Sequence, residues 1–78
     1  MSRGSDIAEC VRQSLDCYFR DLDGEKPSAI YAMVLAQVER PMLEVVMREA
    51  RGNQTQAAEM LGINRNTLRR KLAANDLI

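Results

Sequence analysis

The sequence NQTQAAEMLGINRNTLRRKL, residues 53–72, has the spacing of small, apolar and polar residues that a helix-turn-helix unit requires. In its first helix, Ala57 and Ala58 stand where the second helix must cross closely, and a larger side chain would hold the two helices apart. Leu61 lies on the same face, and Gly62 follows where the chain must leave the helix with a positive φ, which glycine tolerates without steric cost. This stretch therefore predicts two short helices packed across a tight turn.

The turn is predicted to be Gly62-Ile63-Asn64. Ile63 would fill the corner between the helices, and Asn64, a favoured N-cap residue, can accept a hydrogen bond from a free backbone N–H of the second helix. Leu68 and Leu72 are four residues apart in that helix and hence lie on one face. The second helix therefore has an apolar side for packing and a polar side that stays exposed.

The polar side of the second helix is the candidate functional surface. Its first turn can place Asn64 and Arg65 on base edges in a DNA major groove, where arginine is suited to guanine O6 and N7. Phosphate contacts, which add affinity without reading sequence, are expected from Thr67, Arg69, Arg70 and Lys71. The alternative is a basic solvated face with no nucleic-acid role, which the agreement in spacing of the alanine pair, the glycine and the leucines disfavours.

The composition indicates one small all-α domain. The chain has 78 residues, 46% of them hydrophobic, with two tyrosines, one phenylalanine and five methionines, so its core must be aliphatic and rich in methionine. There is no histidine, and no metal-ligand pattern or phosphate loop, so neither an enzyme nor a metal site nor any cofactor is expected. The sequence also lacks an apolar run of about 18 residues and a signal peptide, which predicts a cytoplasmic protein with no membrane partner.

The charges are segregated along the chain, although the net charge is zero. Residues 1–47 carry five basic and eight acidic side chains, a net charge of −3, whereas residues 48–78 carry six basic and three acidic ones, a net charge of +3. Because local charge density governs attraction to a polyanion, the motif end is the end expected to face nucleic acid. Cys10 and Cys17, too far apart on one helix for a disulfide, are expected to be reduced and partly buried.

Two longer helices are predicted upstream of the motif. The first runs from about residue 5 to 22, and the second from about residue 28 to 51. Pro41 lies inside the second helix and is expected to kink it, because the apolar pattern keeps its phase across the proline. A break there, giving five helices, is the alternative. At the C-terminal end of this second helix, Gly52 is expected at the C′ position, and Asn53 or Thr55 is expected to cap the next helix.

The second of these helices is apolar on nearly all sides between Ile30 and Met47, and such a helix must be buried all round. One short neighbouring helix and a small hairpin cannot cover it within a monomer. Residues 1–52 are therefore predicted to form a homodimer through this helix, followed by a helix-turn-helix unit at residues 53–78 within one compact domain. The predicted dimer core consists of Ile30, Val34, Leu35, Val38, Met42, Val45 and Val46.

Residues outside the motif carry a further pattern. The motif with its leading residues, RGNQTQAAEMLGINRNTLRRKL at 51–72, follows VERPMLEVVM at 38–47, and before these come Tyr18-Phe19, Leu22, Gly24, Tyr31 and Val34-Leu35. Together they resemble the bacterial Fis family (factor for inversion stimulation) from about Val11 to Leu72. The C-terminal domains of sigma-54-dependent activators share the motif but match the upstream helices poorly, so the upstream matches favour Fis proper.

The resemblance implies four helices per subunit, with a long kinked central helix in an intertwined dimer core and a C-terminal helix-turn-helix. It implies a homodimer that binds double-stranded DNA in adjacent major grooves, bends it, and selects sites partly through minor-groove width. Carried over by position, Asn64 and Arg65 would meet bases and phosphates at the edge of the site. Mainly backbone contacts are implied for Asn53, Gln54, Thr55, Thr67, Arg69, Arg70 and Lys71.

The sequence departs from the family pattern in three places. Ala73-Ala74-Asn75 stands where the family is rich in lysine, so weaker flanking phosphate contacts and weaker bending are expected. Asn66 replaces a common glycine and would either intrude on the DNA contact or add to it. The chain begins too late to include the N-terminal β-hairpin arm that activates DNA invertases, so invertase activation is not expected.

The sequence thus predicts a homodimeric, DNA-bending, nucleoid-associated transcription regulator of the bacterial cytoplasm. One alternative is the DNA-binding and dimerisation end of a larger sigma-54-dependent activator. Another is a helical protein-interaction adaptor that does not bind DNA.

Overall fold

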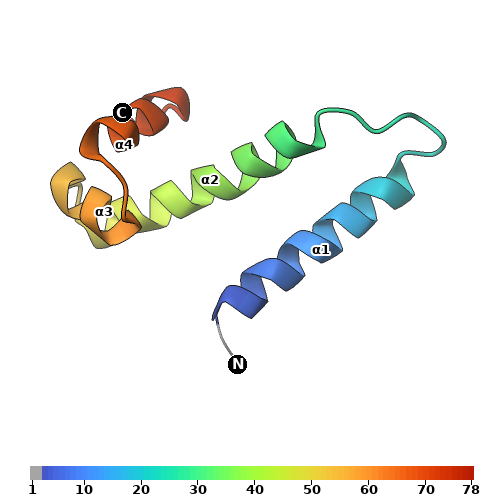
Figure 1. Cartoon of the computed structure of the whole chain (residues 1–78), viewed down its shortest axis with the longest axis horizontal. Helices are drawn as coiled ribbons and strands as arrows, with labels where there is room; N and C mark the ends of the chain where they lie inside the picture. The colour runs from blue at the N-terminus through green and yellow to red at the C-terminus, as the bar shows by residue number, and fades with distance from the viewer. Residues whose placement is uncertain (1–2) are drawn as a thin grey trace. The chain divides into compact units, whose positions relative to one another are not determined.

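The computed structural model describes residues 3–78, and this part of the chain is all-helical. Four α-helices follow one another in sequence, and no strand occurs among these residues: α1 (Arg3–Asp21), α2 (Ile30–Glu49), α3 (Gln54–Leu61) and α4 (Arg65–Ala74) (Figure 1). The prediction of an all-α chain with four helices is confirmed. Packing divides the chain into two compact units, one ending at Val34 and one running from Leu35 to Ile78. The proposed functional division after residue 52 stays a prediction.

Helix α1 begins at Arg3 and ends at Asp21, so it starts earlier than predicted and stops one residue sooner. It ends because Asp23 and Gly24 both have positive φ, 51° and 88°, which a right-handed helix does not allow. Cys10 and Cys17 are free thiols, and both are exposed. The prediction that they are partly buried was therefore wrong, because the apolar stripe of α1 runs along a different face of the helix.

Helix α2 runs without interruption through Pro41, so the alternative of two separate helices is wrong (Figure 1). A kink at Pro41 stays a prediction. The helix is shorter at both ends than the predicted residues 28–51, since it extends from Ile30 to Glu49. At its start, Ala29 has a φ of 55° and therefore lies outside the helix, although its carbonyl oxygen accepts a hydrogen bond from Met33 N at 3.0 Å.

The end of α2 differs from the expected glycine cap. The backbone N–H of Arg51 donates to Arg48 O and that of Gly52 donates to Met47 O, both at 3.0 Å. This pair of hydrogen bonds places Arg51, with a φ of 55°, at the left-handed C′ position, and Gly52 is the residue after it. Gly52 was therefore assigned to the wrong position by one residue, because it too has a positive φ, 80°, and sequence reading could not separate the two.

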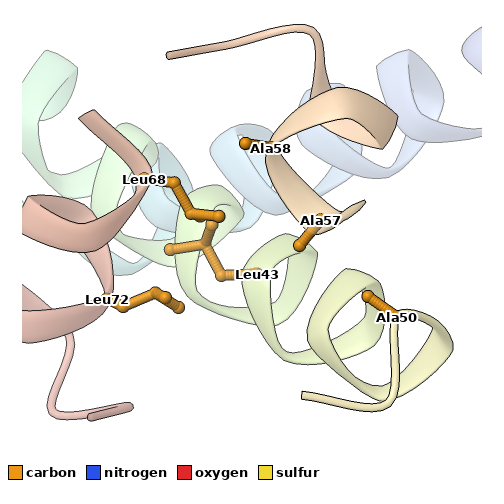
Figure 2. Packing of buried hydrophobic residues seen from close by; sticks show 6 residues of the cluster. All are labelled: Leu43, Ala50, Ala57, Ala58, Leu68 and Leu72. Carbon is orange, nitrogen blue, oxygen red and sulfur yellow. The ribbon is translucent and has the colours of Figure 1, made fainter. Parts of the chain in front are cut away.

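The core of the second unit joins the last part of α2 to both helices of the motif (Figure 2). Leu43 of α2 meets Leu68 of α4 at its centre, and both side chains are completely buried. Ala57 on α3 is completely buried as well, and the close crossing of the two motif helices at this residue stays a prediction. The full cluster is Leu43, Ala50, Ala57, Ala58, Leu68 and Leu72, with Val46, Met47, Leu61, Ile63 and Leu77 packed against it.

The turn between α3 and α4 has the predicted geometry. Gly62 has a φ of 74°, and its N–H donates to Ala58 O at 2.9 Å, while the N–H of Ile63 donates to the same carbonyl at 3.1 Å. Ile63 then packs against the core cluster and closes the corner between the two helices. Because these bonds satisfy the free carbonyls at the end of α3, the entry of the chain into α4 is fixed.

Candidate nucleic-acid interface

The start of α4 is held by a side-chain cap. Asn64 has an extended backbone, with φ −67° and ψ 142°, and its Oδ1 accepts a hydrogen bond from the backbone N of Asn66 at 2.7 Å. This confirms Asn64 as the N-cap. The side-chain amide nitrogen of Asn64 takes no part in the cap and can donate to a base or phosphate. Arg65, the first residue of α4, is exposed beside this cap.

The outward face of α4 is the side turned away from the buried Leu68 and Leu72. A helix advances about 100° per residue, so Asn66, Arg70 and Ala73 project from the side roughly opposite Leu68. All three are exposed. An open hollow on this surface is lined by Asn64, Asn66, Thr67, Arg69, Arg70, Ala73 and Ile78. Most of the predicted DNA-binding residues of α4 therefore gather on one open surface.

Two arginines, Arg69 and Arg70, line this hollow, and Arg65 at the start of α4 does not. Arg65, Arg69 and Arg70 are exposed, and within residues 3–78 none of them lies within ion-pair distance of a carboxylate. The guanidinium of Arg70 does contact Thr67, since Nη2 donates to Oγ1 at 3.5 Å. An arginine without a carboxylate partner keeps its donors for an external anion, and its flat guanidinium can bind a phosphate or a guanine through two parallel hydrogen bonds.

The start of α3 holds the other predicted contacts. Asn53 is the N-cap of α3, since its Oδ1 accepts from Gln56 N at 3.0 Å, which decides between the two predicted caps in favour of Asn53 over Thr55. Thr55 is exposed and Gln54 is half-buried. None of these residues lines the hollow on α4. The backbone N–H of Asn53 donates to Ala50 O at 3.0 Å. Gln54 and Thr55 begin α3, and a helix N-terminus favours an anion.

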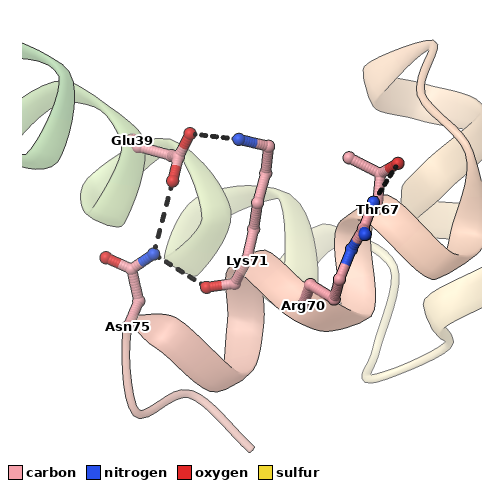
Figure 3. Close-up of polar contacts among 5 residues, drawn as sticks. All are labelled: Glu39, Thr67, Arg70, Lys71 and Asn75. Carbon is pink, nitrogen blue, oxygen red and sulfur yellow. Dashed lines mark hydrogen bonds and ion pairs between the residues drawn. The ribbon is translucent and has the colours of Figure 1, made fainter.

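Lys71 has an intramolecular partner, although the sequence predicted a phosphate contact for it. Its Nζ lies 2.8 Å from Oε2 of Glu39 on α2, and both side chains are partly buried (Figure 3). Asn75 joins the pair, since its Nδ2 donates to Oε1 of Glu39 at 3.5 Å and to the carbonyl of Lys71 at 2.8 Å. Glu39 and Asn75 were not among the predicted site residues, because nothing local in the sequence marks them.

Helix α2 leaves a row of apolar side chains exposed on the side that does not meet the motif. The row consists of Tyr31, Leu35, Val38, Met42 and Val45, exposed by 79%, 47%, 38%, 43% and 46%. Four of these belong to the predicted dimer core, and Tyr31 does not. Of the other three predicted members, Ile30 and Val34 are half-buried, while Val46 packs against the core of the motif.

Comparisons with known proteins bear on this arrangement. The sequence model of the family described as "Bacterial regulatory protein, Fis family" matches residues 34–74, which is more than half of the chain. A Fis-like DNA-binding protein from Ralstonia nicotianae is 59% identical over 78 residues, all of both chains. This chain belongs to the Fis family. A Fis-like DNA-binding protein from Neisseria meningitidis serogroup A is 53% identical to this Fis-family chain over 73 residues, 94% of this chain and 92% of that protein.

A third relative extends beyond this chain. The DNA-binding protein Fis of Glaesserella parasuis is 54% identical over 66 residues, which cover 85% of this Fis-family chain and 67% of that protein. The family match at residues 34–74 nearly coincides with the compact unit from Leu35 to Ile78. The part of the chain that defines the family is thus the end of α2 with the helix-turn-helix packed on it. A regulatory family also agrees with the prediction that the chain is not an enzyme.

Neither a membrane-spanning helix nor a metal-binding cluster is found among the residues that the structure describes in this Fis-family chain. No helix there has both the length and the apolar character needed to cross a membrane. Over the same residues, no three histidine, cysteine, aspartate or glutamate side chains gather where they could hold a metal ion.

Proposed function

We propose that this Fis-family protein binds double-stranded DNA as a homodimer, with α4 of each subunit in a major groove. The observation that carries the proposal is the surface of α4, which has a capped N-terminus and exposed arginines that pair with no carboxylate within the described part of the chain. An α-helix with its side chains is about 10–12 Å wide, which fits the major groove of B-DNA, about 12 Å wide. The names of the relatives, DNA-binding proteins, support the same reading.

The residues of this surface have different roles in the proposal. Arg65 lies beside the N-cap at the tip of α4, which is the end of a recognition helix that meets base edges, so it is assigned to a guanine. Arg69 and Arg70 lie further along the helix and are assigned to phosphates, which set the register on the duplex. Asn53, Gln54 and Thr55 at the start of α3 are assigned to backbone contacts, because a helix N-terminus favours an anion.

The exposed row on α2 supports the homodimer. Its members follow one another at intervals of four, three, four and three residues, from Tyr31 through Leu35, Val38 and Met42 to Val45. This is the heptad spacing of helices that pack side by side. Apolar side chains repeated in this way on one helix are matched best by the same row on a second copy, since a two-fold interface places identical patches against each other.

A homodimer would present two copies of α4 to one duplex. Half-sites read by such a pair are about 34–36 Å apart when they lie on one face of straight DNA. The proposed reading in adjacent grooves, with bending of the DNA between them, follows from the family resemblance. Exposed Ala73 and Ala74 add no charge beside the outward face, so bending is expected to be modest. The proposed role is transcription regulation at the bacterial nucleoid, in the cytoplasm.

The test is a titration of a palindromic site with an A/T-rich centre by fluorescence anisotropy. Arg65→Ala should weaken binding by about 10- to 100-fold, since a good bidentate contact to a base contributes about 1–3 kcal/mol. Arg12→Ala is the matched control, because Arg12 is an exposed arginine on α1 that pairs with Glu9. The control should bind like the parent. Equal affinity of Arg65→Ala and parent would contradict base reading by Arg65, and no binding by the parent at low salt would favour the protein-interaction adaptor.

A further inference from the structure

The cluster formed by Glu39, Lys71 and Asn75 joins the middle of α2 to the C-terminal end of α4 (Figure 3). We call it the α2–α4 clamp. Besides the contacts to the Glu39 carboxylate, Nη1 of Arg40 donates to the backbone carbonyl of Asn75. The neighbouring residues Glu39 and Arg40 thus both hold the last turn of α4. Glu39 uses both of its carboxylate oxygens for this purpose.

The position of Lys71 on its helix explains why it joins the clamp. Lys71 follows Leu68 by three residues, which places the two side chains about 60° apart around the helix axis. It therefore lies at one edge of the buried face of α4, the edge that meets Glu39 of α2. Arg69, about 60° from Leu72, lies at the opposite edge, and Arg70 projects away from the face. In keeping with this geometry, Lys71 is half-buried and does not line the hollow on the outward face.

We infer that Lys71 is a positioning residue for DNA binding and not a phosphate contact. Its ammonium group lies 2.8 Å from the partly buried carboxylate of Glu39, so a phosphate contact by Lys71 would have to break this ion pair. Asn75 stabilises the same state, because its amide bonds both Glu39 and the carbonyl of Lys71. The clamp therefore fixes the direction of α4 relative to α2. The inference rests on the proposed function, since it assigns a role in the DNA complex.

The position of Glu39 on α2 links the clamp to the proposed dimer interface. Glu39 directly follows Val38, a member of the exposed row assigned to the dimer interface. A rigid link from this point to α4 would carry the geometry of the dimer to the two reading helices. Loss of the clamp should therefore relax the preferred distance between half-sites, in addition to lowering affinity.

The experiment compares Lys71→Gln, Glu39→Gln and the charge swap Glu39→Lys with Lys71→Glu in the full chain. For each protein, affinity is measured at several salt concentrations on the best palindrome and on one whose half-site spacing is altered by one base pair. Both single variants should bind the best site about twofold to fivefold more weakly, as expected for a partly exposed ion pair. The single variants should also discriminate less between the two spacings, while their affinity keeps the salt dependence of the parent. The charge swap should restore both affinity and discrimination.

The phosphate-contact reading predicts a different set of results. Removing a phosphate contact lowers the slope of log affinity against log salt by about 0.9 for each subunit. A drop of that size in Lys71→Gln, together with unchanged or tighter binding by Glu39→Gln, would overturn the inference. So would a charge swap that binds more weakly than either single variant. A variant that only loses stability would weaken both sites equally and leave the ratio unchanged, which would also overturn it. If the parent binds neither site, the proposed function itself fails.

Discussion

Replacement of Leu35 by alanine should weaken the proposed homodimer by an amount that follows from the exposure of Leu35. Leu35 is 47% exposed in the single chain, in the middle of the exposed row on α2. Full burial of a leucine side chain contributes about 1.5–3 kcal/mol, so burial of the exposed part contributes about 0.7–1.4 kcal/mol in each subunit. A symmetric dimer contains the contact twice, which gives about 1.4–2.8 kcal/mol. Since about 1.4 kcal/mol is a factor of ten, the dimer Kd should rise about 10- to 100-fold.

Sedimentation equilibrium over a range of protein concentrations measures this change directly. Gln37→Ala is the matched control, because Gln37 is exposed on the same helix and lies off the apolar row. Its dimer Kd should equal that of the parent. Thermal unfolding gives a second measure, since the midpoint of a dimer depends on protein concentration and that of a monomer does not. A parent that stays monomeric at micromolar concentration, or a Leu35→Ala protein with the Kd of the parent, would refute the assignment of the row to the interface.

Three further changes test other parts of the structure. Leu68→Ala should lower the free energy of unfolding by about 2–5 kcal/mol in chemical denaturation, because Leu68 is completely buried, while exposed Arg69→Ala should leave it nearly unchanged. At the two left-handed C′ positions, Gly62→Ala should destabilise and Arg51→Gly should stabilise the fold, each by about 1 kcal/mol; the same sign for both changes would contradict the cap assignments. Ala73→Lys should tighten DNA binding and steepen its salt dependence by about 0.9 in log–log slope per subunit, whereas Gln13→Lys on α1, which adds the same charge elsewhere, should not.

The helix-turn-helix could be predicted from the sequence because its determinants are local. The positive φ of Gly62 and the capping side chain of Asn64 act on residues within a few positions of themselves. Leu68 and Leu72 are buried as their spacing predicted. The family resemblance followed from the same stretch with its upstream neighbours, and the family match confirmed it.

The clamp could not be predicted because its partners are distant in sequence. Glu39 and Lys71 are 32 residues apart, and the contact exists only after α4 has folded back on α2. In the sequence, Lys71 is one member of a basic run, so it was assigned to phosphates with Arg69 and Arg70. Helical periodicity places Lys71 and Arg69 at opposite edges of the buried face, and periodicity alone does not show at which edge an acidic partner lies.

The left-handed residue at the end of α2 was misplaced for a different reason. Arg51 occupies the C′ position with a φ of 55°, although a glycine stands next to it in the sequence. The preference for glycine at C′ is statistical, and here both residues have positive φ, so hydrogen bonding decides which of them ends the helix. Such a one-residue shift is visible only in the backbone.

The apolar character of α2 on nearly all sides has a specific cause, since two different surfaces share this helix. One face, with Leu43 and Ala50, forms a wall of the helix-turn-helix core and is buried within the chain. The other carries the exposed row around Leu35 and Met42. Both faces belong to one continuous helix. Any shift of a partner along the exposed row therefore also changes the position of that partner relative to the motif. The proposed reading surface on α4 is therefore tied to the proposed dimer interface by packing at Leu43 and by the clamp at Glu39. Weakening either link should alter site selection before it abolishes dimerisation.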